Sequence, residues 1–494
     1  MSESQIASIV ATSILVTLFT LMRKTLINRS AISVFFLSHL VFVFIGVLLL
    51  PWVQPIMGEH IAIGQSKMSI NLFAHIPFWV FSQQDYTRGI VLTVGGACIV
   101  LASYLSSNHI LGSQQLKTCD RRDEKPASII VDLHISRLYF ISGFCLLMAA
   151  LFATRNIGAY YHGLTVGILQ GNPPAIIDAR REVGDNFAMV LLSLSIVPFF
   201  SVVLWLLNQS KPGHRRTWYP RIYLVAAILL LVLTFQKRPL IVFIAILFFA
   251  TRWLKSSQSN TRNFDLALLL RKRIVDVMVL GGLFGVVMLF YIAFSNYGRN
   301  GESIFDAVFG IAIVAGSRIV FRLATPGVMY AHYFPNVDGH YGFTNIGLFS
   351  KIFGFERYAD TQAIFAYCGG DGGGTAVCTL VDMYGGFSFY GWAAGSVLIG
   401  ILLSRLDQFL ISLSRRRSVL SIAITAFAFL SVYYMSQASI FRTLNGYGAL
   451  WFALCGLILH KSAKSVDIRR KRRPTAPMIA QSRNASEFQT ASCE

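Results

Sequence analysis

Charged residues are scarce in this chain. Of its 494 residues, only 13% are charged and 54% are hydrophobic, whereas a soluble domain carries roughly a quarter charged residues. This shortage excludes an ordinary soluble domain. Most of the chain is therefore expected to lie in lipid.

Spaced metal-ligand motifs are also absent. The sequence contains neither a Cys-x-x-Cys pair nor a His-Glu-x-x-His motif, which are the spacings typical of zinc sites. We therefore predict no metal and no cofactor. The N-terminus has no basic segment ahead of its first apolar run, so we expect no cleaved signal peptide.

Long apolar runs are abundant. A helix needs about 20 mostly apolar residues to cross a bilayer, because every backbone polar group must be satisfied inside the lipid. Such runs occur near residues 6–22, 31–52, 89–106, 138–154, 187–207, 220–235, 240–253, 274–295, 388–404, 419–436 and 447–460. They predict an all-α polytopic membrane protein of about eleven transmembrane helices, in a range of about 10–14.

Basic residues outnumber acidic ones, and the formal net charge is +20. Most lysines and arginines occupy short loops near residues 23–29, 117–137, 211–221, 252–273 and 405–417, or the tail. Because positive loops stay in the cytoplasm, this distribution predicts a cytoplasmic C-terminus and an N-terminus on the opposite side. The charge determines orientation, and no nucleic-acid partner is expected.

The chain divides into four parts. Residues 1–460 form the predicted transmembrane domain, and we expect the basic segment 461–494 to be a disordered cytoplasmic tail that contacts anionic lipid. Two segments, 155–186 and 296–387, are non-cytoplasmic loops. The second is too long for a simple connection, so we expect it to contain short helices.

Lys237 and Arg238 occupy a tight turn between two apolar runs on the non-cytoplasmic side. Cations there break the charge pattern of the other loops and usually face a polar cavity or a substrate. The alternative is that both side chains extend to the lipid headgroups.

Arg318 and Arg322 are four residues apart, so they share one face of a helix. Two guanidinium groups on one face can bind the oxygens of a diphosphate. The alternative pairs them with Glu302, Asp306 or Asp382.

His332 follows these arginines and has a side chain suited to proton transfer near neutral pH. A lone histidine is more often packed or hydrogen-bonded than catalytic. Arg180 and Arg181 lie in the earlier loop beside Asp178, Glu182 and Asp185, so local ion pairs explain them as well as substrate binding does.

Cys368 and Cys378 flank a glycine-rich segment. This segment lacks the Lys-Ser/Thr ending of a P-loop. Two cysteines ten residues apart in an oxidising compartment are expected to form a disulfide that closes the loop.

The chain resembles the Wzy-type oligosaccharide repeat-unit polymerases, and more distantly the O-antigen ligases. The resemblance rests on the layout of residues 138–460 and on three stretches: Lys237-Arg238-Pro239 opening a helix, Arg318 to Arg322 followed by Tyr330 and His332, and 374–391 with Gly374-Thr375 and Val381 to Gly391. The Arg-x10-Gly spacing of some members is absent, because Leu191 and Leu192 stand at that distance from Arg180 and Arg181.

The resemblance implies a metal-independent glycosyltransferase of GT-C-like architecture in the bacterial inner membrane. It would act in O-antigen or exopolysaccharide biosynthesis, on glycans linked to undecaprenyl diphosphate, at the periplasmic face. Its partners would be this lipid-linked oligosaccharide, membrane lipid, and a chain-length regulator or export machinery.

In the expected mechanism, Lys237, Arg238, Arg318 and Arg322 bind the departing diphosphate, and His332 or Asp382 accepts the proton of the acceptor hydroxyl. The glycan-binding candidates are Arg180, Arg181, Tyr297, Tyr330 and Tyr341. A ligase and a lipid-linked oligosaccharide flippase or transporter remain the alternatives.

Overall fold

The structure is a computed structural model. It describes residues 1–25, 30–56, 61–63, 68–70, 81–115, 133–169, 187–210, 218–234, 237–258, 324–345, 352–356, 358–368, 377–416, 418–439 and 448–460, with isolated positions at 175, 178–179, 182–183, 316, 320–321, 350 and 443. The tail after residue 460 and the predicted span 274–295 lie outside these residues.

Nearly all of the described chain is helical. The helices are α1 (Glu3–Thr25), α2 (Ser30–His39), α3 (Ile45–Val53), α4 (Gln83–Ile90), α5 (Gly96–Gln115), α6 (Ile135–Arg155), α7 (Ile157–His162), α9 (Phe187–Leu191), α10 (Val197–Ser210), α11 (Trp218–Leu233), α12 (Lys237–Gln258), α15 (Thr325–Tyr333), α17 (Asp360–Tyr367), α18 (Thr379–Arg416), α19 (Val419–Tyr434) and α20 (Ala449–Leu459). Short π-helical segments η1 (Leu40–Phe44), η3 (Val91–Gly95), η5 (Gly163–Leu169) and η6 (Leu192–Ile196), and the 3₁₀ turn η2 (Gln54–Ile56), continue or join them. One antiparallel hairpin of β1 (Ile61–Ile63) and β2 (Met68–Ile70) departs from the all-α prediction.

Six helical segments are long and apolar enough to cross a membrane: Glu3–Thr20, Ala31–Val53, Gln83–Asn108, Ile135–Arg155, Ala188–Ser210 and Thr379–Leu413. Three shorter apolar helices are Trp218–Leu233, Val419–Tyr434 and Ala449–Leu459. These segments confirm, within the described ranges, that the chain is a helical protein embedded in the membrane by several spans.

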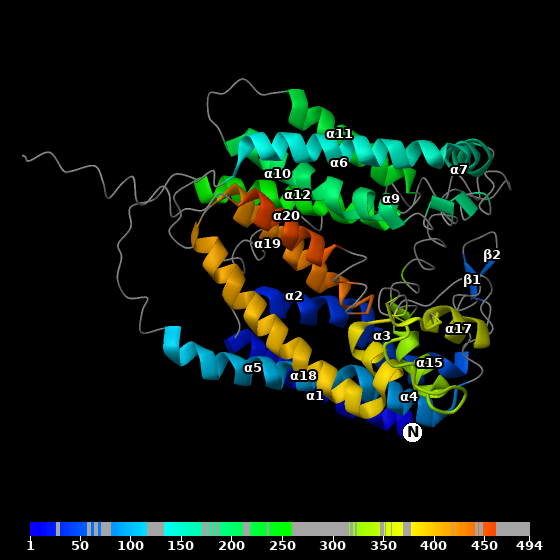
Figure 1. Ribbon diagram of the computed structural model, residues 1–494. Coiled ribbons are helices and arrows are strands. Elements are labelled where there is room, and N and C mark those ends of the chain that lie inside the picture. Colours follow the sequence, from blue (N-terminus) through cyan, green and yellow to red (C-terminus); the bar gives the residue numbers. More distant parts are fainter. Residues whose placement is uncertain are drawn as a thin grey trace, which may run out of the picture.

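The helices pack side by side in two layers (Figure 1). One hydrophobic core is built by α1–α5, α15, α17 and α18, and the other by α6–α12, α19 and α20. Helix α19 joins the layers, since its Ile424 and Phe429 pack against both cores. Close approach has a local cause at Gly400, where an added Cβ would meet the Val100 carbonyl oxygen of α5 at 2.4 Å.

The bundle has two ends with different contents. At the first, which we call the α4 end, the hairpin, α4, α15, α17 and the N-terminus gather (Figure 1). At the second, His134 at the start of α6 donates its backbone N–H to the carbonyl of Leu459 at the end of α20. Here also Asp407 of α18 accepts the backbone N–H of Ala31 at 2.7 Å, which satisfies a free donor at the start of α2.

Helix α18 is interrupted close to the α4 end. Phe387 and Ser388 leave the helical conformation, and Ser388 has φ 62° and ψ −164°, a region that normally only glycine occupies. The part after the break is held in place by Trp392, whose Nε1 donates to the Leu92 carbonyl at 2.8 Å. The apolar run predicted at 388–404 is therefore only the second part of a longer, broken helix.

The predicted loops are partly helical. The first part of the loop 155–186 forms α7 and η5, and the loop 296–387 contains the short helices α15 and α17 and the first turns of α18. Helix α12 begins at Lys237, within the segment 236–239 that was predicted to form a turn.

Candidate functional site

Several residues of the predicted diphosphate and glycan sites belong to segments that the structure does not describe. Arg180, Arg181, Tyr297, Arg318 and Arg322 lie outside the described residues. Lys237 and Arg238 occupy the first turn of α12, but their side chains are also outside the description. The roles predicted for these residues stay predictions.

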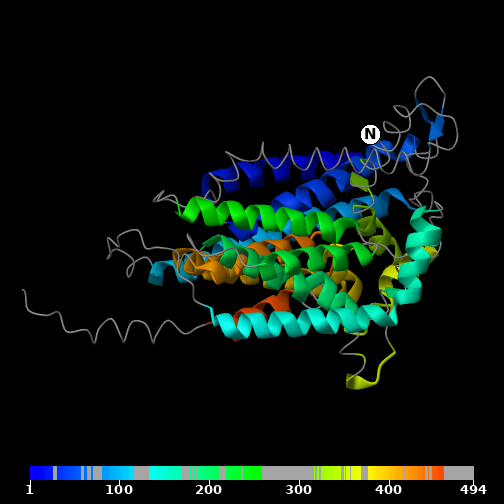
Figure 2. The same cartoon turned by 90° about the horizontal axis from the view of Figure 1, so that it is seen from above.

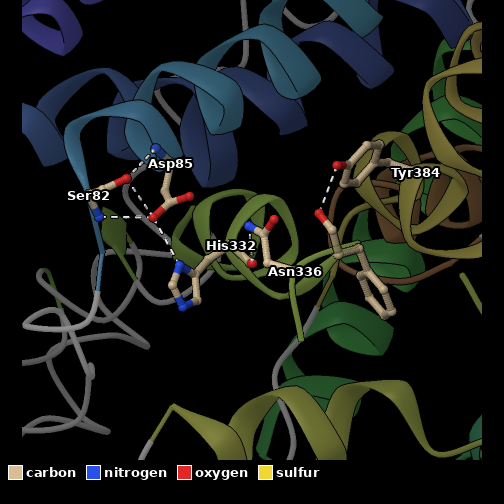
Figure 3. Close-up of polar contacts among 6 residues, drawn as sticks. Ser82, Asp85, His332, Asn336 and Tyr384 are labelled. Carbon is tan, nitrogen blue, oxygen red and sulfur yellow. Dashed lines mark hydrogen bonds and ion pairs between the residues drawn. The ribbon is translucent and has the colours of Figure 1, made fainter. Parts of the chain in front are cut away.

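His332 contacts an acidic side chain from a distant part of the sequence. Its Nδ1 lies 2.9 Å from Oδ2 of Asp85, 247 residues away along the chain (Figure 3). A carboxylate only accepts hydrogen bonds, so Nδ1 carries the hydrogen and Nε2 is left as the acceptor. The contact is an aspartate–histidine pair of the type that orients a general base.

Asp85 is held firmly at the N-terminus of α4. Ser82 caps this helix, and its backbone N–H and its hydroxyl both donate hydrogen bonds to Asp85 Oδ2 at 2.9 Å. The backbone N–H of Asp85 in turn donates to Ser82 Oγ at 3.2 Å. This reciprocal arrangement is a capping box. The same oxygen therefore receives three hydrogen bonds, two from Ser82 and one from His332 (Figure 3).

Small residues allow α4 and α15 to approach closely enough for the pair to form. A Cβ at Gly89 of α4 would meet the backbone of Val328 in α15 at 3.1 Å. A Cβ at Gly327 would meet the Thr93 side chain at 3.3 Å. Larger side chains here would separate the helices and lengthen the distance from Asp85 to His332.

Aromatic rings surround the imidazole without covering it. The ring centroid of Phe81 lies 5.6 Å from that of His332, and the Tyr367 centroid lies 6.0 Å away on α17. The His332 side chain is 19% exposed and Tyr367 is 46% exposed. The imidazole is thus partly exposed, with one exposed aromatic ring next to it.

Arg88 is a cation of this site that the sequence analysis overlooked. It follows Asp85 by one turn of α4, is half-buried, and lies close enough to the Tyr384 hydroxyl to act on it electrostatically. Within the described part of the chain, its guanidinium makes no hydrogen bond or ion pair, whereas its backbone carbonyl accepts the N–H of Val91. The sequence could have indicated this residue, because Arg88 is a cation next to the start of the predicted span 89–106, which was expected to lie on the non-cytoplasmic side.

Asp382 is a poor candidate for the base. It is 4% exposed, and its carboxylate Oδ1 accepts the Tyr341 hydroxyl at 3.1 Å and the Asn345 amide at 3.5 Å. A buried carboxylate whose oxygen is already hydrogen-bonded serves the packing of the loop against α18. His332 is thus more exposed than Asp382, and the choice of base between them stays a prediction.

The prediction that Tyr330 and Tyr341 stack on sugar rings is wrong for this arrangement. They are 0% and 8% exposed and belong to the hydrophobic core, so neither presents a free ring face. The Tyr330 hydroxyl donates to Asp360. Burial and the neighbouring Asp382 raise the pKa of Tyr341 well above its usual value, which keeps it a hydrogen-bond donor.

The predicted disulfide is also wrong, because Cys368 and Cys378 are free thiols in the structure. Cys368 ends α17, and burial raises its pKa to about 12. Cys378 immediately precedes α18, and burial raises its pKa to about 11. Both thiols are buried in the hydrophobic core, a packing role that the spacing alone did not indicate.

Comparison with known proteins identified no relative. No protein-family model, no curated protein and no solved structure matched this chain.

The chemistry available at the α4 end follows from these contacts. His332 can accept a proton at Nε2, Asp85 can stabilise the resulting imidazolium, and Arg88 can bind an anion. No group of three or more His, Cys, Asp or Glu side chains able to hold a metal lies among the residues that the structure describes.

Proposed function

We propose that this protein is a glycosyltransferase that transfers a polyprenyl-diphosphate-linked glycan to the hydroxyl of another lipid-linked repeat unit, as a polysaccharide polymerase. The observation that carries the proposal is the aspartate–histidine pair of Asp85 and His332, whose imidazole is partly exposed at one end of a membrane-embedded bundle. A substrate anchored in lipid can reach such a position without leaving the membrane.

In the proposed reaction, Nε2 of His332 takes the proton of the acceptor hydroxyl while the oxygen attacks the anomeric carbon of the donor. The bond from that carbon to the diphosphate oxygen breaks, and the lipid diphosphate leaves with the electron pair. Asp85 stabilises the imidazolium through the hydrogen bond at Nδ1. No oxidant or reductant is needed.

Arg88 supports the same step by stabilising the charge that develops on the diphosphate. A guanidinium without an acidic partner among the described residues is available to an anion, and removing one such donor typically costs about 10²–10³ in kcat. Lys237 and Arg238 begin α12. We propose that these two residues, with Arg318 and Arg322, provide the other positive charges around the diphosphate.

The finer topology belongs to the same proposal. Ten of the eleven apolar runs coincide with helices, and the eleventh lies outside the described residues. An eleven-span GT-C-like arrangement with a cytoplasmic C-terminus in a bacterial inner membrane would put His332 on the periplasmic face, because the basic loops belong to the opposite end. Lipid-linked oligosaccharide is the proposed substrate, and a chain-length regulator or export complex the proposed partner.

The test is a reaction of the purified, vesicle-reconstituted protein with a lipid-linked repeat unit, followed by separation of the products by size. A ladder of elongated lipid-linked glycans is expected from the wild type, and about a 10²–10⁴-fold slower reaction from His332→Gln, the range for loss of a general base. Arg88→Gln should also be slowed, and Arg155→Gln, an exposed cation at the end of α6, should not. Transfer only to a lipid A core or a protein would identify a ligase instead, and full activity of His332→Gln would refute the catalytic assignment.

A transporter is the second candidate, favoured by the break in α18. Interrupted helices commonly form the substrate sites of secondary transporters, and the break at Phe387 and Ser388 adjoins Tyr384 near Arg88. A flippase would move a labelled lipid-linked glycan between the vesicle leaflets without altering its length. Translocation that persists in His332→Gln, with no elongated product from the wild type, would decide for this candidate.

A further inference from the structure

A short turn after α15 exposes large apolar side chains. Ile352, Phe353 and Phe355 are 67%, 58% and 53% exposed, and the rings of Phe353 and Phe355 stack with centroids 6.3 Å apart. Gly354 between them has φ +69°, which places both phenylalanines on the same turn. An exposed apolar group of this size calls for a partner.

The base of this turn is fixed to the rest of the protein. The backbone N–H of Phe355 donates to the Ser350 carbonyl at 2.9 Å and closes the turn. Ser350 Oγ donates to the carbonyl of Thr344 at 2.7 Å, and the N–H of Tyr358 donates to the same carbonyl at 3.2 Å. The apolar side chains are therefore presented outward by a held loop.

The direction of the turn indicates what it meets. In Figure 2 the yellow-green stretch that contains it projects from the side of the bundle near the α7 end of α6, rather than onward along the helix axes. Beside the ends of membrane-crossing helices lies the boundary between acyl chains and headgroups, where aromatic residues accumulate.

We propose that Ile352, Phe353 and Phe355 form an interfacial anchor that inserts into the lipid bilayer beside the bundle. The side chains at the tip of this turn favour a lipid over a glycan or a protein as the partner. The tip offers an aliphatic and two aromatic side chains without a polar group between them, and the basic residues Lys351 and Arg357 flank it in the sequence. Basic residues flanking an apolar tip are attracted to anionic headgroups.

The anchor sets the depth of the loop that leads to the proposed site. Tyr358, which follows the turn, donates its hydroxyl to Asp338 at 2.7 Å and contacts the Tyr333 hydroxyl at 3.4 Å. Tyr333 directly follows His332 in α15. The inference does not depend on the proposed reaction, because any ligand of the α4 end would meet the same loop.

Photo-crosslinking tests this contact directly. The full-length protein carrying p-benzoylphenylalanine in place of Phe353 is reconstituted into vesicles of phosphatidylethanolamine and phosphatidylglycerol, irradiated and digested. The matched control carries the probe at Gly339, an exposed loop position where an added Cβ meets nothing within 4 Å. We expect peptides bearing a phospholipid adduct from position 353 and none from position 339.

Other outcomes would overturn the proposal. A crosslinked dimer from position 353 would show that the turn meets a second copy of the chain, and a crosslink to an added glycan would show a substrate surface. The same probe at Ile352 repeats the measurement if the first variant does not yield folded protein, judged by its elution in detergent. Absence of lipid adducts at both positions would refute the anchor.

Discussion

Substitutions of Asp85 test whether this residue positions His332 for catalysis or only stabilises the start of α4. Three donors converge on its Oδ2: the backbone N–H and hydroxyl of Ser82 and Nδ1 of His332, each at 2.9 Å. In Asp85→Asn the amide oxygen can take the place of Oδ2, because the fixed N–H of Ser82 selects an acceptor there. The imidazole then keeps its tautomer and loses only the negative charge beside it.

The size of the effect follows from that geometry. A hydrogen bond to a charged group contributes about 1.5–3 kcal/mol, and 1.36 kcal/mol corresponds to a factor of ten in rate, so kcat of Asp85→Asn should fall about 10- to 100-fold. Asp85→Ala also releases the ring, so its loss should approach the roughly 10²–10⁴-fold expected from removing the base. KM for the lipid-linked substrate should change little in both.

The assay is the initial rate of elongation by purified protein, with Ser82→Ala as the matched control. Ser82→Ala removes the cap and one donor to Asp85, so it should cost about 1 kcal/mol of stability and leave kcat nearly unchanged. The double variant Asp85→Ala/His332→Gln should be no slower than His332→Gln, because Asp85 acts through the histidine. Wild-type kcat in Asp85→Ala, or additive losses in the double variant, would refute the reasoning.

Two further predictions concern the loop around the site. In Gly385→Ala the new Cβ would lie 2.8 Å from the Tyr330 ring, so overpacking should lower the stability by about 1–3 kcal/mol and lower the melting temperature in detergent. The control Gly158→Ala, with open space around it, should raise the stability by about 0.5–1 kcal/mol. Equal melting temperatures of the two variants would contradict this prediction. Burial raises the pKa of Cys368 to about 12 and that of Cys378 to about 11, so at pH 8 only about one Cys368 thiol in 10⁴ is ionised. Iodoacetamide should therefore label both cysteines only after denaturation. A disulfide-linked peptide in the mass spectrum would contradict this prediction.

The spans were predictable because lipid imposes a local rule. Each segment must satisfy its own backbone and present apolar side chains, and both requirements can be seen in a short window of sequence. The rule failed where tertiary contacts replace lipid. Helix α18 begins at Thr379, before the apolar run, because Asp382 in its first turn is buried against Tyr341 and Asn345.

His332 could be proposed as a base from its residue type, but its partner could not. Asp85 lies in a different helix, 247 residues away, and no local spacing connects the two. The burial of Tyr330 and that of Cys378 in the hydrophobic core depend equally on distant packing. For these residues, a role assigned by type alone was the wrong one.

The sequence by itself determined that the chain lies in a membrane as a set of helices, because hydrophobicity and backbone satisfaction act within each segment. Only the tertiary structure decided that α4 meets α15, that Asp85 holds His332, and that Arg88 lies one turn away. The physical reason is range: a transmembrane helix depends on its own twenty or so residues, whereas a site depends on which helix ends the packing brings together.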